Sequence, residues 1–232
     1  MGTNDNGDVV GGSGDCGVFN ANTGLNLVAL HALLWHNGTA INLGNLKGTG
    51  EGAGILAFNV NNEDEVVGFS DTLNNASFHA FLWTGETGML DLGTLHSDDI
   101  GSAATGLDDE GNVVGLSLDS TFTPHAFLRP KGEAMIDLNT LIPSDSPLFL
   151  LQACSINSRG ELTGLAIENS TGDLHAFLAT PSSSEAVSDS SAATEQGESS
   201  EGRKVVLTEN ARSQLQKLLR FHLPGVQPTQ PQ

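Results

Sequence analysis

A short segment that begins with histidine occurs four times in this chain of 232 residues, and its repetition limits the fold more than any other feature. It reads "HALLW" at 31–35, "HAFLW" at 79–83, "HAFLR" at 125–129 and "HAFLA" at 175–179. The histidines lie 48, 46 and 50 residues apart. Near-regular self-similarity of this length is the signature of a repeat architecture, in which each copy is one small structural unit.

The residues around each histidine have the pattern of short strands joined by tight turns. In the third copy, "AATGL" leads through "DDEGN" to "VVGLSL", and a polar loop then leads to "HAFLR" and "MIDLNTL". Valine, isoleucine, leucine and phenylalanine fill the strand segments, while asparagine, aspartate and glycine punctuate them. We interpret "DDEGN" and its counterparts as hairpin turns, in which glycine takes the positive-φ position.

The expected fold class is all-β, with tandem four-stranded antiparallel repeats forming a partial or small β-propeller. The four repeats span about 1–48, 49–97, 98–143 and 144–180. The first begins inside its opening turn and the fourth ends after "HAFLA", so we expect 3, 4, 4 and 3 strands. A β-solenoid with long rungs is the alternative, which the hairpin-like turns disfavour.

Such an array leaves open sheet edges at both ends. We therefore expect an incomplete propeller, part of a longer parent protein, or closure with a partner chain. Exposed strand edges favour self-association through those ends.

The C-terminal part of the chain has a different composition. Residues 181–202 are predicted to be a disordered acidic linker, because they combine serine and acidic residues with few apolar ones. Residues 203–232 predict a basic amphipathic helix that begins at Thr208, with an apolar stripe of Leu215, Leu218 and Leu219. Such a helix could contact a membrane, a partner or the acidic body of the same chain. Docking on the body is the simplest of these options, and a free helix is the alternative.

The charge and the ends of the chain limit the partners. A formal net charge of −19 disfavours nucleic acid, because phosphate binding requires lysine and arginine. No segment has the length and hydropathy of a transmembrane helix, and no signal peptide is visible.

With "HAFLW", "DLGTL" and "NDNGDVVG" in place, residues 4 to about 180 resemble the HAF-repeat family of extracellular bacterial repeats, named for its His-Ala-Phe triplet. The resemblance implies a secreted or cell-surface bacterial protein with propeller-like repeats, and no established activity or cofactor. We expect a non-catalytic binding or structural module whose unknown ligand is a protein or a glycan. From a different class, a propeller-type polysaccharide hydrolase or lyase is the alternative. The segment 15–30, which interrupts the repeat pattern, is the best candidate for a binding or packing loop.

The repeated histidines are candidates for metal ligands, catalytic bases or scaffold, and they are His31, His79, His125 and His175. Ligands of one metal ion must lie within about 2 Å of it, whereas one histidine per blade keeps the four apart. Each of the first three has a polar residue in the strand that follows, namely Asn42, Asp91 and Asp137. A hydrogen bond between them would fix the register of each blade, so we favour a scaffold role over catalysis or metal binding.

A glycine also recurs at one place in the second strand segment of each copy, and we assign a structural role to these positions: Gly11, Gly68, Gly115 and Gly164. No catalytic, cofactor-binding or metal-binding residue is predicted. The motifs G-x-S-x-G and H-E-x-x-H and a P-loop are missing from the sequence.

The acidic turns raise the question of calcium. "NDNGD", "NNEDE" and "DDEGN" are rich in the oxygen atoms that this hard cation prefers. None has the spacing of a calcium loop with a distal glutamate, and "NSRGE" places Arg159 where a ligand would be needed. We prefer the hairpin interpretation and keep calcium as the alternative.

Overall fold

The computed structural model describes residues 1–14, 31–47, 54–72 and 77–181. These residues form an all-β structure of fourteen strands and one 3-10 helix. The predicted loop at 15–30, the acidic linker and the C-terminal basic helix lie outside the described residues.

The strands are distributed as three, four, four and three among four consecutive units, which confirms the predicted count within the described residues. Unit 1 contains β1 (Val9–Ser13), β2 (His31–His36) and β3 (Thr39–Asn42). Unit 2 contains β4 (Ile55–Val60), β5 (Val66–Asp71), β6 (Phe78–Thr84) and β7 (Gly88–Gly93). Unit 3 contains β8 (Gly101–Leu107), β9 (Val113–Leu118), β10 (Pro124–Arg129) and β11 (Ile136–Asp137). Unit 4 contains β12 (Leu148–Ile156), β13 (Leu162–Glu168) and β14 (Leu174–Ala179).

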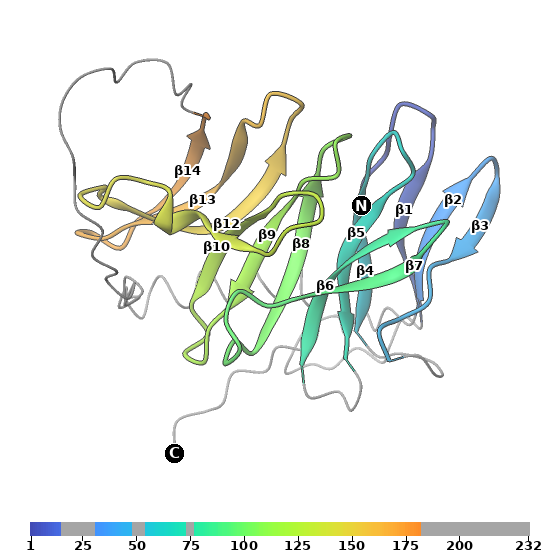
Figure 1. Ribbon diagram of the computed structural model, residues 1–232, viewed down its shortest axis with the longest axis horizontal. Coiled ribbons are helices and arrows are strands. Elements are labelled where there is room, and N and C mark those ends of the chain that lie inside the picture. Colours follow the sequence, from blue (N-terminus) through green and yellow to red (C-terminus); the bar gives the residue numbers. More distant parts are fainter. Residues whose placement is uncertain (15–30, 48–53, 73–76, 182–232) are drawn as a thin grey trace, which may run out of the picture.

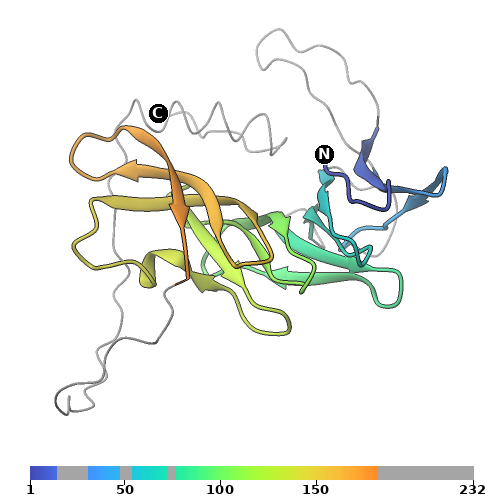
Figure 2. The same ribbon diagram turned by 90° about the horizontal axis from the view of Figure 1, so that it is seen from above.

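Each unit is a sheet of antiparallel strands paired in chain order. A single parallel bridge between Phe78 and Gly101 joins units 2 and 3 into one eight-stranded sheet. The four units lie side by side in chain order, and the described strands form an open row rather than a closed ring (Figure 1). Seen from above, units 1 and 4 lie at opposite ends of this row (Figure 2).

The last strand of unit 3 is shorter than "MIDLNTL" predicts. It ends at Asp137, and a 3-10 helix, η2 (Leu138–Thr140), follows. The Asp137 side chain accepts a hydrogen bond of 2.8 Å from the Asn139 backbone N–H, which turns the chain out of the sheet. The Asn139 amide then bonds both backbone groups of Leu150, at 2.7 and 2.9 Å, and so joins unit 3 to unit 4.

Buried apolar side chains fill every junction between neighbouring units. Between units 1 and 2, Ala32 and Leu34 of β2 pack with Ile55, Ala57 and Phe81 of unit 2. Side chains alternate along a strand. In units 1 to 3 the alanine and the last leucine of the "HALL" or "HAFL" segment therefore lie on the face toward the following unit, and the residue between them lies on the opposite face. The two other junctions contain equivalent side chains: Ala80, Leu82, Ala104 and Phe127 between units 2 and 3, and Ala126, Leu138, Leu150 and Ala153 between units 3 and 4.

Buried serines in the second strands add polar contacts between units. The backbone N–H of Leu46, which follows β3, donates to Ser70 Oγ of unit 2 at 3.1 Å. Leu95, which follows β7, donates in the same way to Ser117 Oγ of unit 3 at 3.2 Å. The closing segments of units 1 and 2 are thus attached to the second strand of the next unit.

The repeated glycine lies opposite a β-bulge in units 2, 3 and 4. In each, the bulge in the opening strand directly follows an alanine that pairs with the glycine, and the pairs are Ala57–Gly68, Ala104–Gly115 and Ala153–Gly164. The carbonyl oxygen that precedes the alanine lies only 1.9, 2.0 and 2.0 Å from the place where a Cβ on the respective glycine would be. Only a residue without a side chain fits such an approach.

The phenylalanine of the His-Ala-Phe triplet covers the same glycine from the third strand. Phe81, Phe127 and Phe177 pair with the glycines of their units, and their ring carbons come within 2.9, 2.8 and 2.6 Å of the same Cβ position. An aromatic ring over a cross-strand glycine supplies the packing that the glycine lacks.

Gly11 differs from its counterparts. It pairs with Leu33 in the expected register, but the nearest atoms to its Cβ position are Met1 Cγ at 3.5 Å and an atom of Trp35 at 3.6 Å. These are ordinary contacts, so the steric requirement for glycine holds in units 2 to 4 and not in unit 1.

This difference gives a matched pair of variants. Gly115→Ala should lower the free energy of unfolding by about 3 kcal/mol or more, because its methyl group meets the Ala103 carbonyl and the backbone must move. Gly11→Ala should change it by less than about 1 kcal/mol. Urea denaturation followed by circular dichroism measures both, and equal losses would contradict the steric account.

Candidate functional site

The repeated histidines bond the strand that follows them in each of the first three units. His79 Nδ1 donates to the two carboxylate oxygens of Asp91 at 2.9 and 3.0 Å. In unit 1 the Asn42 amide donates to His31 Nδ1 at 3.1 Å. These hydrogen bonds confirm the predicted pairing, while its contribution to register stays a prediction.

The pair in unit 3 is the most enclosed. His125 Nδ1 donates to Asp137 Oδ2 at 2.9 Å, and the two side chains are only 14% and 13% exposed. The His125 ring also makes edge-to-face contacts with Phe149 and His96. Burial opposes protonation of His125, but the hydrogen bond and the charge of Asp137, helped by Asp119, raise its pKa above the ordinary value. Burial likewise works against ionisation of Asp137, yet the hydrogen bond from His125 lowers the pKa of that carboxyl.

His175 has a different environment, because the described part of unit 4 has no strand after β14. Its nearest acidic partner is Glu168, with an Nε2–Oε2 distance of 3.5 Å, and its side chain is 47% exposed. The histidine is therefore repeated in unit 4 without the aspartate or asparagine that bonds it elsewhere. The structure keeps the four histidines in separate units, as the one-per-unit prediction requires.

The hairpin turns after the opening strands share one internal hydrogen-bond pattern. The backbone N–H of the fifth turn residue donates to the side-chain oxygen of the first, at 2.9, 2.8, 2.8 and 3.1 Å in units 1 to 4. The side chains of these positions also pair as an amide with a carboxylate, at 2.9, 2.8, 2.8 and 2.6 Å. The pairs are Asn4–Asp8, Asn61–Glu65, Asp108–Asn112 and Asn157–Glu161. Side-chain oxygen atoms of the first and fifth turn residues thus accept hydrogen bonds within their own hairpins.

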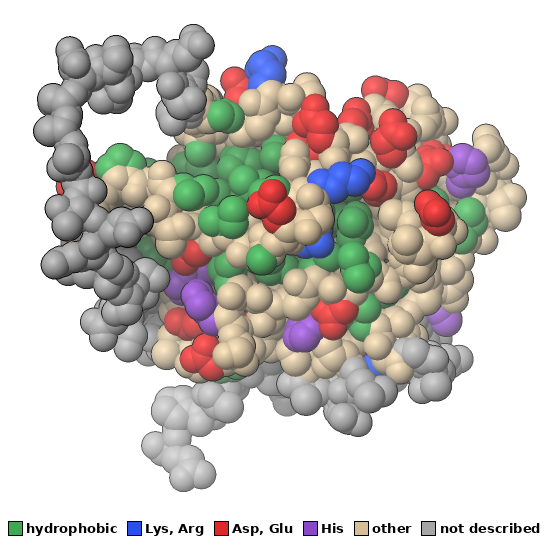
Figure 3. Space-filling model, viewed as in Figure 1, with side chains coloured by type: hydrophobic (Ala, Val, Ile, Leu, Met, Phe, Trp, Pro, Cys, Tyr) green, Lys and Arg blue, Asp and Glu red, His purple; other side chains and the backbone are tan. Residues whose placement is uncertain are grey.

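Neighbouring turns are also linked to each other. The Asn4 amide donates to the Asn61 carbonyl at 2.9 Å, and the Asn61 amide donates to the Asp108 carbonyl at 2.9 Å. Asp108 has a carboxylate in place of the amide, so it cannot donate to unit 4 in this way. Acidic side chains gather along this upper edge of the molecule (Figure 3).

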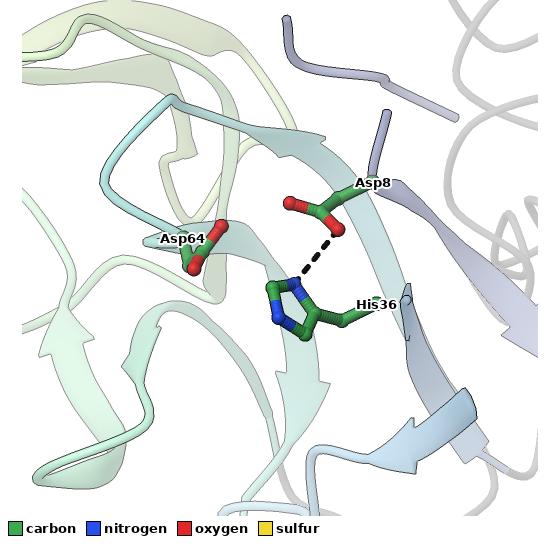
Figure 4. Close-up of side chains that lie close together, drawn as sticks. All are labelled: Asp8, His36 and Asp64. Carbon is green, nitrogen blue, oxygen red and sulfur yellow. Dashed lines mark hydrogen bonds and ion pairs between the residues drawn. The ribbon is translucent and has the colours of Figure 1, made fainter. Parts of the chain in front are cut away.

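A histidine and two aspartates come together on the same edge, at the junction of units 1 and 2. Asp8 lies in the turn before β1, His36 ends β2, and Asp64 lies in the turn before β5 (Figure 4). One potential ligand atom from each lies within 4.8 Å of the others, and this is the only such group of three in the described residues. Asp8 is 2% exposed, while the other two are half-buried.

Hydrogen bonds hold this group in place. His36 Nδ1 donates to Asp8 Oδ1 at 2.8 Å. The Asn4 amide donates to Asp8 Oδ2 at 2.9 Å and reaches Asp64 Oδ1 at 3.5 Å. The bond from Asn4 lowers the pKa of Asp8 in spite of its burial. Burial and the neighbouring Asp8 raise the pKa of Asp64. Two oxygen donors and one nitrogen donor at this spacing can hold a proton or a divalent cation.

The residues that the four copies share do not include this group, so the repeat pattern gives no indication of it. The signal lay in two departures from the repeat. Asp64 occupies the turn position where the other units have Gly7, Gly111 and Gly160. His36 follows its segment where Thr84, Pro130 and Thr180 follow the others.

The terminal units expose apolar residues whose counterparts are buried. Leu178 in β14 is 67% exposed, whereas Leu34 and Leu82 are 2% and 9% exposed. Ala176 is exposed as well, while its counterparts in the other three units are fully buried. At the other end, Val9 in β1 is 39% exposed, whereas Val66 in unit 2 is 0% exposed.

The described part of the chain contains no helix with the length and apolarity needed to cross a membrane. Comparisons with protein-family models, with curated proteins and with solved structures find no match. The resemblance to HAF repeats therefore rests on the residues quoted above and stays a prediction.

The histidine pairs yield a direct test of their scaffold role. His125→Ala should lower the free energy of unfolding by about 1–3 kcal/mol, because it removes the donor to the buried Oδ2 of Asp137, while Oδ1 keeps its bonds from Asn139. His175→Ala is the matched control and should cost less than about 0.5 kcal/mol, since that side chain is half exposed. Chemical denaturation of the two variants should separate them, and equal losses would exclude a role for the histidine–aspartate bond.

The same pair predicts a pH dependence. The raised pKa of His125 makes its contribution complete below about pH 6.5 and lost as pH rises through the folded pKa. The lowered pKa of Asp137 makes its contribution complete above about pH 4 and lost as pH falls through its folded pKa. The difference in melting temperature between the wild type and His125→Ala should therefore be largest between about pH 4 and pH 6.5. A difference that does not change with pH would contradict the shifted pKa values of this pair.

Proposed function

We propose that the chain is a non-catalytic β-repeat module that associates by stacking its terminal units on units of the same kind, with a second copy of this chain as the partner. The main observation that supports the proposal is the exposure of Leu178. Covering a leucine side chain contributes about 1.5–3 kcal/mol, and the leucines at the same position in units 1 and 2 are buried by the next unit.

The internal junctions indicate what covers such a face. In each of them the alanine and leucine of one unit pack against apolar residues of the next. Unit 4 presents Ala176 and Leu178 on the face that points away from unit 3. Unit 1 presents Val9 and Trp35, which are 39% and 37% exposed, on the face that points away from unit 2. The two ends of the row therefore carry second-strand and third-strand residues of the two halves of an internal junction, and a head-to-tail contact would bring them together.

One residue makes the unit 4 face more polar than the internal ones. Val10, Val67 and Val114 face the following unit from their second strands, and Thr163 takes this place in unit 4. A hydroxyl in place of a methyl group weakens apolar stacking. We infer a reversible association rather than a permanent one.

We further propose that the four units are blades of a propeller-like array. Their strands pair in chain order, and the opening strands β4, β8 and β12 contact one another in succession through the middle of the row. The face-to-face burial between units is the packing that propeller blades use.

We propose a location outside the cell or on the bacterial surface, which the resemblance to HAF repeats implies. Besides the second copy of the chain, we propose a ligand that is a protein or a glycan. The acidic upper edge and the net charge of −19 disfavour nucleic acid. No feature of the described residues favours the polysaccharide hydrolase or lyase, so we do not propose it.

Light scattering after size exclusion tests the end-face contact. The mass of the wild-type chain should rise above the monomer value of 24.1 kDa with increasing concentration. Leu178→Asp should keep the chain monomeric, because a carboxylate would be buried without a partner. Thr163→Val should shift association to lower concentrations, because it restores the valine of the other units.

Leu141→Asp is the matched control, since Leu141 is 60% exposed but follows η2 in unit 3, which is an internal unit of the row. It should associate as the wild type does. A wild-type chain that stays monomeric at every concentration, or an equal effect of both aspartate variants, would overturn the proposal.

A further inference from the structure

The turn edges at the first two junctions differ in charge. Between units 2 and 3, the Glu65 carboxylate accepts a hydrogen bond of 3.2 Å from the Lys131 ammonium, and the facing turn position is Gly111. Between units 1 and 2, Asp8 takes the place of Glu65 and Asp64 takes the place of the glycine. The first junction thus has two carboxylates where the second has one.

The cation of the second junction is also missing from the first. Lys131 belongs to the later unit of its junction, and the equivalent residue in unit 2 is Gly85, which has no charge, whereas the group that donates to Asp8 is the imidazole of His36 of unit 1. An imidazole carries at most one positive charge, so Asp8 and Asp64 together exceed it. A divalent cation would balance this charge as the lysine does at the next junction.

We propose that Asp8, His36 and Asp64 bind one divalent transition-metal ion of the Zn²⁺ class, and that the ion fastens unit 1 to unit 2. Two carboxylate oxygens and one imidazole nitrogen are a donor set that Zn²⁺ accepts. Imidazole favours such an ion over Ca²⁺, which takes oxygen ligands. The site is independent of the end faces, because it lies at an internal junction.

The three donor atoms would have to move slightly closer together to bind one ion. The three donor atoms lie within 4.8 Å of one another, and ligands of one Zn²⁺ at bond lengths of about 2.0–2.2 Å lie about 3–4 Å apart. The ion would displace the proton that His36 Nδ1 now donates to Asp8. Water would complete the coordination.

Neighbouring amides supply the support that metal ligands need. Asn4 reaches one oxygen of each carboxylate, at 2.9 Å from Asp8 and 3.5 Å from Asp64, and so orients both. The Asn37 amide lies 2.7 Å from His36 Nε2. With Nδ1 on the metal, Nε2 carries the hydrogen, and Asn37 can turn its oxygen to accept it.

The position of Asp64 is specific to this junction. Its φ of 60° lies in the left-handed region, where the other three units have glycine at φ values of 85°, 84° and 72°. Asp64→Gly therefore restores the residue of the repeat and removes one ligand without a steric penalty. It is the variant of choice for a test.

The experiment is a titration of the full chain, freed of metal and of any histidine tag, with Zn²⁺ by isothermal calorimetry and with Co²⁺ by visible absorption. The proposal predicts one ion per chain and Co²⁺ bands of a site with nitrogen and oxygen ligands. Asp64→Gly and His36→Thr, which introduces the residue of unit 2, should each weaken binding more than about tenfold. His175→Gln, which removes an exposed histidine in unit 4, should bind as the wild type does.

Each other outcome overturns the inference. It fails if the wild type binds no ion, or if Asp64→Gly binds as tightly as the wild type. It also fails if His175→Gln weakens binding as much as His36→Thr, since that would indicate scattered surface histidines. Leu178→Asp, the monomeric variant of the end-face test, should keep the site, so failure of one proposal is distinguishable from failure of the other.

Discussion

A sheet of four short strands has two faces and cannot bury either of them alone, and the rest of the structure follows from this constraint. Every described junction is formed in the same way, by packing the alanine and the last leucine of a "HALL" or "HAFL" segment against the next unit. The same solution leaves Leu178 and Val9 uncovered at the two ends of the row. Stability inside the row and association at its ends are thus two consequences of one contact.

Stacking requires that each unit present its faces in a fixed register. The glycine of the second strand permits the approach of a bulged opening strand, and the phenylalanine of the triplet fills the space above it. The histidine at the head of the triplet bonds the strand beyond, as His125 does with Asp137. Each residue of the triplet therefore makes a different contact. The histidine hydrogen-bonds the next strand, the alanine packs against the next unit, and the phenylalanine covers the glycine of the second strand.

Repetition explains both what could be predicted from the sequence and what could not. The strand count and the bonds of His79 and His125 were predictable because each appears in several copies at one spacing. The bulges opposite Gly68 and Gly115 were not predictable. A backbone carbonyl that approaches a glycine requires only that glycine and no other particular residue type, so the sequence does not reveal the bulge. The Asp8 group was missed since it depends on turns from two units, and its members are departures from the repeat.

Amide hydrogen exchange, followed at low and high protein concentration, tests most directly the claim that each unit is completed by the next. The account predicts that β10, covered by unit 4, is strongly protected at both concentrations, whereas β14 exchanges rapidly in dilute solution and becomes protected as the concentration rises. Equal protection of β10 and β14 in dilute solution, or protection of β14 that does not change with concentration, would contradict it.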